Sequence, residues 1–215
     1  MCETDGSAPV ILSPGCPTTG TKRSPTDTPP MGKRLFVSVD LDGLAEDVAA
    51  VQERFADASG LRFTDPEQAH VTLKFLGDTD EDRVPELADE LAAAVGDTGV
   101  EPFEMTVSGL GVFPGLDYVS VVWVGVDEGS HELTALHEAI EERTVAMGFD
   151  AADHEFTPHA TIARMDHAGG KELVQERVRE DDPAVGWVAV EEVRLKESVL
   201  GSDGSTYSTI KRFEL

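Results

Sequence analysis

The chain has 215 residues with 42 acidic and 17 basic side chains, and its formal net charge of −25 excludes attraction of nucleic acid by charge alone at low salt. No stretch approaches the roughly 20 apolar residues that span a bilayer, so we expect no membrane association. The acids are spread along the chain and lysine is scarce, which predicts a high-salt cytoplasm, as in halophilic archaea; an acidic mesophilic protein is the alternative.

Residues 1–30 differ from the rest of the chain. They are rich in Pro, Thr, Ser and Gly, which predicts a disordered N-terminal extension, and Met31 is the expected native start. Cys2 and Cys16 both lie in this extension, so residues 31–215 hold no disulfide, zinc–thiolate site or cysteine nucleophile. A reducing cytoplasm fits this distribution, and we expect residues 31–215 to form a single bilobal domain.

Alternating or β-branched runs predict a series of strands in the remainder of the chain. They cover residues 34–40, 61–63, 70–75, 103–107, 118–126, 159–163, 187–200 and 206–213, and the run at 187–200 is broken near Glu191 and Glu192. Apolar residues at helical spacing predict helices at 44–58, 82–95, 130–147 and 171–180. Asp42 and Ser130 are candidate N-caps, and residues 109–115 are expected to form a glycine-rich bend. Trp123 and Trp187 lie in apolar strands and are expected in the core.

The order of these elements predicts an α+β fold. Each half of the chain carries helices, several strands and one His-x-Thr strand, which indicates a weak internal symmetry. No glycine-rich loop of the nucleotide-binding type is present. We therefore expect antiparallel sheets with helices on their outer faces.

The tetrapeptide HVTL at 70–73 recurs as HATI at 159–162. Because side chains alternate along a strand, His70 and Thr72 point to one face, as do His159 and Thr161, while the apolar residues anchor the other face. Two such strands sharing a cleft would supply two imidazoles and two hydroxyls for acid–base chemistry on a phosphate ester.

Two less specific interpretations stand beside this one. A histidine on a strand often has a purely structural, hydrogen-bonded role, and composition alone can produce a His-x-Thr pattern. A metal site could be imagined from His154, Glu155, His159 and His167, but their spacing matches no common metal motif. We therefore expect no metal site from these residues.

The chain resembles the 2H phosphoesterase superfamily, and within it the RNA 2′,3′-cyclic phosphodiesterase family, once called 2′-5′ RNA ligases. The resemblance rests on the segments RLFV at 34–37, HVTLKFLG at 70–77, GLGVFP at 109–114, VWVGV at 122–126 and FTPHATIAR at 156–164. It implies a bilobal, pseudo-two-fold fold with two antiparallel sheets and outer helices around a central cleft. It also implies hydrolysis of RNA 2′,3′-cyclic phosphodiester ends to 2′-phosphomonoesters, with no metal and no organic cofactor.

The resemblance assigns roles to individual residues. It implies that His70 donates a proton to the leaving oxygen and that His159 accepts one from water. Thr72, Thr161 and Arg164 would bind the substrate phosphate. Strict alternation would put Arg164 on the face opposite His159, so the strand should end or twist there.

Further expectations accompany this assignment. Lys74 falls on the His70 face and could contact phosphate, or it could be a structural lysine. The expected partner is an RNA or oligonucleotide end with a 2′,3′-cyclic phosphate, and the expected state is a monomer. A related 2H enzyme acting on another small cyclic phosphate or a 2′-5′ linkage, and a non-catalytic RNA-binding module, remain alternatives.

Overall fold

The computed structural model describes residues 32–201 and 204–215, so the extension predicted at 1–30 lies outside the described residues, as do residues 202 and 203 between the strands predicted at 187–200 and 206–213. Within them are nine strands, four α-helices and two short 3₁₀ helices. The strands are β1 (Lys33–Asp40), β2 (Leu61–Phe63), β3 (His70–Thr79), β4 (Phe103–Gly115), β5 (Tyr118–Val126), β6 (His159–Met165), β7 (Ala184–Val190), β8 (Glu192–Gly201) and β9 (Gly204–Glu214). The α-helices are α1 (Ala45–Glu53), α2 (Val84–Thr98), α3 (Ser130–Ala146) and α4 (Lys171–Glu180).

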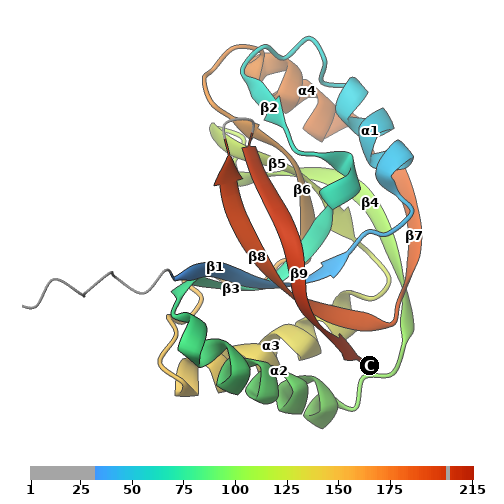
Figure 1. Ribbon diagram of the computed structural model, residues 1–215. Coiled ribbons are helices and arrows are strands. Elements are labelled where there is room, and N and C mark those ends of the chain that lie inside the picture. The colour runs from blue at the N-terminus through green and yellow to red at the C-terminus, as the bar shows by residue number, and fades with distance from the viewer. Residues whose placement is uncertain (1–31, 202–203) are drawn as a thin grey trace, which may run out of the picture.

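The strands form one curled antiparallel sheet, shown in Figure 1. Its order is β7-β4-β5-β6-β3-β1-β8-β9, and β2 pairs with β6. We call β3, β1, β8 and β9 the first lobe, and β7, β4, β5, β6 and β2 the second lobe. The lobes are joined by the pairing of Val71 in β3 with Ala160 in β6. The predicted α+β architecture is confirmed, and the two expected antiparallel sheets are joined edge to edge into this one sheet.

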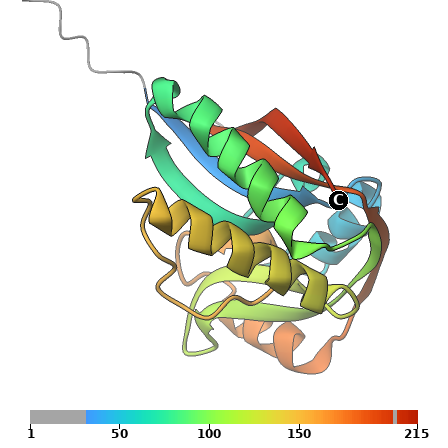
Figure 2. The same ribbon diagram turned by 90° about the horizontal axis from the view of Figure 1, so that it is seen from below.

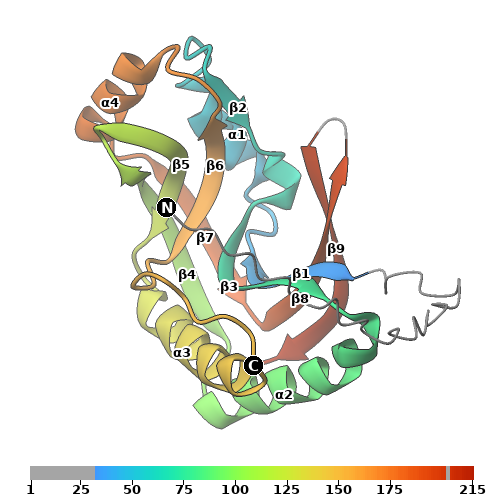
Figure 3. The same ribbon diagram turned by 90° about the vertical axis from the view of Figure 1, so that its left-hand side faces the viewer.

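The helices cover the outside of the two lobes. Helices α2 and α3 lie side by side against the sheet, as Figure 2 shows, and they contact β9 and β3 of the first lobe. Helices α1 and α4 lie at the other end of the molecule, where they contact β6, β7 and β4 of the second lobe (Figure 3). None of the described helices is long and apolar enough to cross a membrane.

Each lobe is covered by a helix from the other half of the chain. Helix α1 follows β1 of the first lobe but packs on β6 and β7, while α3 follows β5 of the second lobe but packs on β3. The buried face of α3 carries Leu133, Leu136 and Ile140, which recur at helical spacing and have no exposed surface. Because each of these helices packs on the lobe opposite to the strand that precedes it, both motif strands share one hydrophobic core.

The expectation of a bend at residues 109–115 was wrong. These residues continue β4 and pair with β5 as far as Gly115. The backbone at Gly109 adopts a positive φ of 71°, which absorbs a shift in register between Ser108 and Leu110. The glycines are therefore irregularities within a strand, which composition alone does not distinguish from a bend.

The break expected near Glu191 and Glu192 in the strand predicted at 187–200 is confirmed, and its two parts lie in different lobes. β7 is an edge strand, whereas β8 lies between β1 and β9. β7 ends at Val190 and pairs with β4, whereas β8 begins at Glu192 and pairs with β1. Trp187 was expected in the core but is 63% exposed, because Val188 and its alternate neighbours occupy the inner face of β7. The chain crosses between the lobes at Glu191.

The two predicted helix caps were also wrong. Helix α1 begins after Leu44 without a side-chain cap, and Asp42 forms an ion pair with Arg194 instead. Helix α3 has Gly129 at its N-cap, and the Ser130 hydroxyl donates to the Val126 carbonyl. Each side chain thus interacts with a group outside its helix and does not accept from the N–H groups of the first helical turn.

We expect the free energy of unfolding to rise between low salt and molar KCl. At molar salt the Debye length is roughly 3 Å, so repulsion within a chain of net charge −25 is largely screened. Urea unfolding followed by circular dichroism at both salt concentrations measures the difference. A free energy that stays constant or falls on adding KCl would contradict the high-salt interpretation of the composition.

Candidate active site

The two motif strands lie next to each other and pair antiparallel. The pair that joins them, Val71 and Ala160, has both side chains fully buried. By alternation the residues on either side of each point to the opposite face. The register also sets the histidine of each motif beside the threonine of the other motif. Four half-buried polar side chains therefore gather on one face: His70, Thr72, His159 and Thr161.

Both motif histidines are oriented in the same way. The Nδ1 atom of His70 lies 2.7 Å from the Gln68 carbonyl oxygen, and Nδ1 of His159 lies 2.7 Å from the Thr157 carbonyl oxygen. A carbonyl oxygen can only accept, so each Nδ1 carries the hydrogen and donates it. The Nε2 atom of each ring is then the one left to exchange a proton with a ligand.

Aromatic rings hold each imidazole from two sides. Around His70, the centroid of Phe36 lies 5.0 Å away in a tilted arrangement and that of Tyr207 lies 5.1 Å away, edge to face. Around His159, Phe113 lies 4.9 Å away, edge to face, and Trp123 lies 5.8 Å away and tilted. Such contacts limit the motion of the imidazoles and exclude water from their flanks.

Trp123 is not the core residue that its apolar strand predicted. Its neighbours Val122 and Val124 occupy the buried face of β5, so the indole lies on the same face as His159. A Cβ atom at Gly111 would come within 2.0 Å of the indole, so only glycine leaves room for it. The signal in the sequence was the alternation of Trp123 with Val122 and Val124 on either side of it.

Burial lowers the pKa of both motif histidines below their ordinary value of 6.5. For His70 the hydrogen bond to Gln68 partly opposes burial, while the positive charges of Lys196 and His159 lower the pKa further. For His159 the charge of Arg164 adds to the lowering. Because each imidazolium is disfavoured by a neighbouring cation, a bound anion is the natural complement of this site.

The first motif strand contains a β-bulge directly after its threonine. In the β1–β3 register Thr72 pairs with Ser38 and Lys74 with Val37, so Leu73 is an extra residue. Leu73 and Lys74 are therefore both buried, and the next residue, Phe75, is 71% exposed. The bulge thus shifts Phe75 onto the face of the motif side chains.

The second motif strand contains the same irregularity. In the β5–β6 register Thr161 pairs with Trp123 and Ala163 with Val122, which leaves Ile162 as the extra residue. Ile162 and Ala163 are both buried, and Arg164 is exposed. The expected twist before Arg164 is therefore present, and it places this side chain on the face of its motif histidine.

Arg164 has no ion-pair partner among the described residues. Its neighbour across the β2–β6 register, Arg62, is paired with Asp166 at 3.1 Å. In a chain where acids outnumber bases more than two to one, an exposed arginine without a carboxylate partner is available to an anionic ligand.

Lys74 does not lie at the motif face, so the possibility that it contacts phosphate there was wrong. The bulge turns it into the core, where it is 4% exposed. Its Nζ donates to Glu141 of α3 at 2.5 Å and to the Asp150 carbonyl at 2.6 Å. These contacts make it a structural lysine, the alternative that the sequence left open.

A buried charge cluster beside His70 was not predicted. Asp40 pairs with His70 in the β1–β3 register and accepts from Lys196 Nζ at 2.6 Å, from Arg194 at 2.7 Å and from the Ser38 hydroxyl at 3.0 Å. Burial raises the Asp40 pKa, but these donors outweigh it and leave the pKa lowered. Asp40 is more than 150 residues from Arg194 and Lys196, so no local pattern could reveal these contacts.

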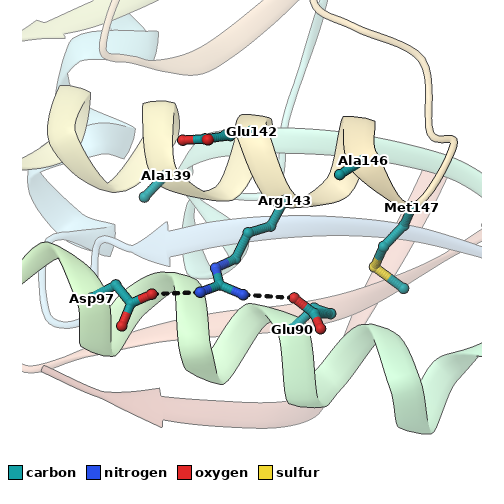
Figure 4. A pocket seen from close by; sticks show the side chains of 7 residues that line it. All are labelled: Glu90, Asp97, Ala139, Glu142, Arg143, Ala146 and Met147. Carbon is teal, nitrogen blue, oxygen red and sulfur yellow. Dashed lines mark hydrogen bonds and ion pairs between the residues drawn. The ribbon is translucent and has the colours of Figure 1, made fainter.

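Other candidate sites do not involve the motif residues. Within residues 32–201 and 204–215, no group of three or more His, Cys, Asp or Glu side chains is arranged to hold a metal ion. A hollow on the outer surface between α2 and α3 contains Arg143, which pairs with Asp97 and, at 2.7 Å, with Glu90 (Figure 4). These two ion pairs join α2 and α3.

Comparisons with known proteins agree with this geometry. The family model of the 2′-5′ RNA ligase superfamily matches residues 40–198. The RNA 2′,3′-cyclic phosphodiesterase of Methanothermobacter thermautotrophicus is 35% identical over 190 residues, which cover 86% of this chain and 100% of the relative. The protein of the same name from Archaeoglobus fulgidus is 32% identical, with coverage of 84% and 99%.

Solved structures show the same fold. TT0787 of Thermus thermophilus superposes with a TM-score of 0.70 at 26% identity, covering 85% of this chain and 97% of that one. LigT of E. coli in complex with 3′-AMP gives a TM-score of 0.69 at 24% identity, covering 86% and 98%. From the paired motifs, the extent of the family match and the archaeal relatives, we conclude that this chain belongs to the 2′-5′ RNA ligase superfamily of 2H phosphoesterases.

Proposed function

We propose that this chain hydrolyses the 2′,3′-cyclic phosphodiester ends of RNA to 2′-phosphomonoesters without a metal. The observation that carries the proposal is the pairing of Val71 with Ala160, which gathers two histidines and two threonines around one point. Archaeal relatives with 28–36% identity are named RNA 2′,3′-cyclic phosphodiesterase, and they match along most of their length. The fold, the site and the names of the relatives point to one reaction class.

The reaction needs one base and one acid on opposite sides of phosphorus. His159 Nε2 takes a proton from water as the water oxygen attacks phosphorus. The bond from phosphorus to the 3′ oxygen breaks, and His70 Nε2 gives its proton to that oxygen. The products are a 3′ hydroxyl and a 2′-phosphomonoester. One imidazole must therefore start neutral and the other protonated.

The remaining polar groups suit the charge that develops in the transition state. The hydroxyls of Thr72 and Thr161 donate to the non-bridging oxygens of the phosphate. The guanidinium of Arg164 supplies a fixed positive charge that has no carboxylate to neutralise it among the described residues. Exposed Phe75 occupies the equivalent place after the first motif and offers an apolar surface to the nucleoside.

The proposal extends to a monomeric, cytoplasmic enzyme that acts on RNA ends. All four groups of the site come from one chain, so no second copy is needed to complete it. Both cysteines lie in residues 1–30, which suits a reducing compartment.

Substitution of either motif histidine tests the proposal directly. We expect His70→Ala and His159→Ala each to lower kcat/KM on a 2′,3′-cyclic nucleotide by roughly 10²–10⁴-fold, the usual contribution of general acid–base catalysis. The assay contains EDTA and is run at low and molar salt, and nuclear magnetic resonance identifies the product isomer.

A matched control is His131→Ala, which removes an exposed histidine near the start of α3 and should keep full activity. Near-normal turnover by either motif variant, or a 3′-phosphomonoester as product, would refute the proposed mechanism. Activity that disappears with EDTA would refute its independence of metal.

The pH dependence should be bell-shaped, with the alkaline limb of kcat/KM below that of kcat. In the free enzyme burial lowers the pKa of both histidines below 6.5, so the required proton on His70 is lost as pH rises through a value below neutrality. The bound phosphate anion favours that proton and moves the alkaline limb of kcat upward. Initial rates across pH measure both limbs, and identical limbs would contradict this account.

A further inference from the structure

The two motif strands diverge immediately after the pair that joins them. Within the described residues, β3 and β6 pair with each other at Val71 and Ala160 alone. Two positions further along, Leu73 and Ile162 are fully or almost fully buried. The carbonyl group of each of these residues accepts a hydrogen bond from a side chain of a covering helix.

A buried glutamine supplies one such donor in the second lobe. Gln52 lies on α1 and is 8% exposed. Its amide nitrogen donates to the Ile162 carbonyl at 2.9 Å and to the Thr64 carbonyl at 2.9 Å. The backbone N–H and the hydroxyl of Thr64 also donate to the Ile162 carbonyl, both at 3.0 Å. Gln52 thus bridges the end of β2 and the bulge of β6.

The first lobe has an equivalent arrangement. His137 lies on α3 and is 9% exposed, and its Nδ1 lies 2.7 Å from the carbonyl oxygen of Leu73, the bulge residue of β3. Its ring stacks on Phe156 with centroids 4.2 Å apart. In both lobes, a covering helix therefore sends one buried polar side chain to the extra residue that follows a catalytic motif.

The bulge at Ile162 decides where Arg164 points. Without the extra residue, strict alternation would place Arg164 on the face opposite His159. We infer that Gln52 is a positioning residue, which holds the bulge of β6 and thereby keeps the guanidinium of Arg164 at the phosphate site. This inference rests on the proposed function, because it requires Arg164 to contact the substrate.

A positioning role differs measurably from a structural one. A structural glutamine would change stability and leave the folded enzyme fully active. A glutamine that acts through Arg164 would weaken substrate use in the folded enzyme, and it would lose its effect once Arg164 is absent. A double-mutant cycle separates these cases.

The test compares Gln52→Met, Arg164→Ala and the double variant at molar salt, using a 2′,3′-cyclic dinucleotide. Methionine keeps the volume of glutamine but lacks the donor. We expect Gln52→Met to lower kcat/KM about tenfold, as for a displaced catalytic neighbour. In the Arg164→Ala background the same change should have an effect of less than about twofold.

Gln175→Met is the matched control. Gln175 lies on α4 and also donates from its amide to a backbone carbonyl, that of Leu116 at 2.7 Å, but it is remote from the motifs. It should keep wild-type kcat/KM. If Gln52→Met does not fold, Gln52→Asn replaces it, since its shorter amide cannot reach both carbonyls, and the same outcomes apply.

Measurements of ligand binding and of wild-type activity distinguish a failure of this inference from a failure of the proposed function. Calorimetric titration with 2′-AMP should show weaker binding by Gln52→Met than by the wild type. The double variant should bind 2′-AMP no more weakly than Arg164→Ala alone. Equal binding and kcat/KM in wild type and Gln52→Met, or a full tenfold effect in the Arg164→Ala background, would overturn the role of Gln52. A wild-type enzyme that fails to open the cyclic phosphate would instead overturn the proposed function.

Discussion

The pairing of Val71 with Ala160 is the constraint on which the site depends. Their small side chains are buried beneath the sheet, and this fixes the face to which the flanking polar residues point. A slip of one residue in this register would turn both histidines into the core. Among the described residues the two strands pair at this one position, and it keeps the four polar groups of the motifs close to one another.

The structure holds this arrangement from outside through elements exchanged between the halves of the chain. Helix α1 packs on the second lobe and α3 on the first, and each sends a polar side chain to the bulge after a motif. The bulges interrupt alternation, so Arg164 and Phe75 join the face of the histidines. The buried pair of Lys74 with Glu141 anchors the first bulge on its core side. The two bulges thus add side chains to the face of the sheet that carries the motif histidines.

The protein as a whole is strongly negative, whereas positively charged side chains lie beside both motif histidines. The chain carries a net charge of −25, yet cations surround the motif face: Lys196 beside His70, and Arg164 beside His159. Asp40 neutralises part of this charge by accepting from Lys196, whereas Arg164 has no carboxylate partner among the described residues. An anionic substrate would therefore meet a local field that differs from that of the whole molecule.

The sequence by itself determined the motif strands, the helices and the residues with the required chemistry, because local periodicity and residue type encode these directly. It could not determine that the two segments on either side of Glu191 join different lobes, the course of β4 through residues 109–115 or the exposure of Trp187, since these depend on which strands become neighbours. Only the tertiary structure decided that Lys74 is buried and that Gln52 reaches the second motif, because bulges and contacts between distant residues follow from packing rather than from local pattern.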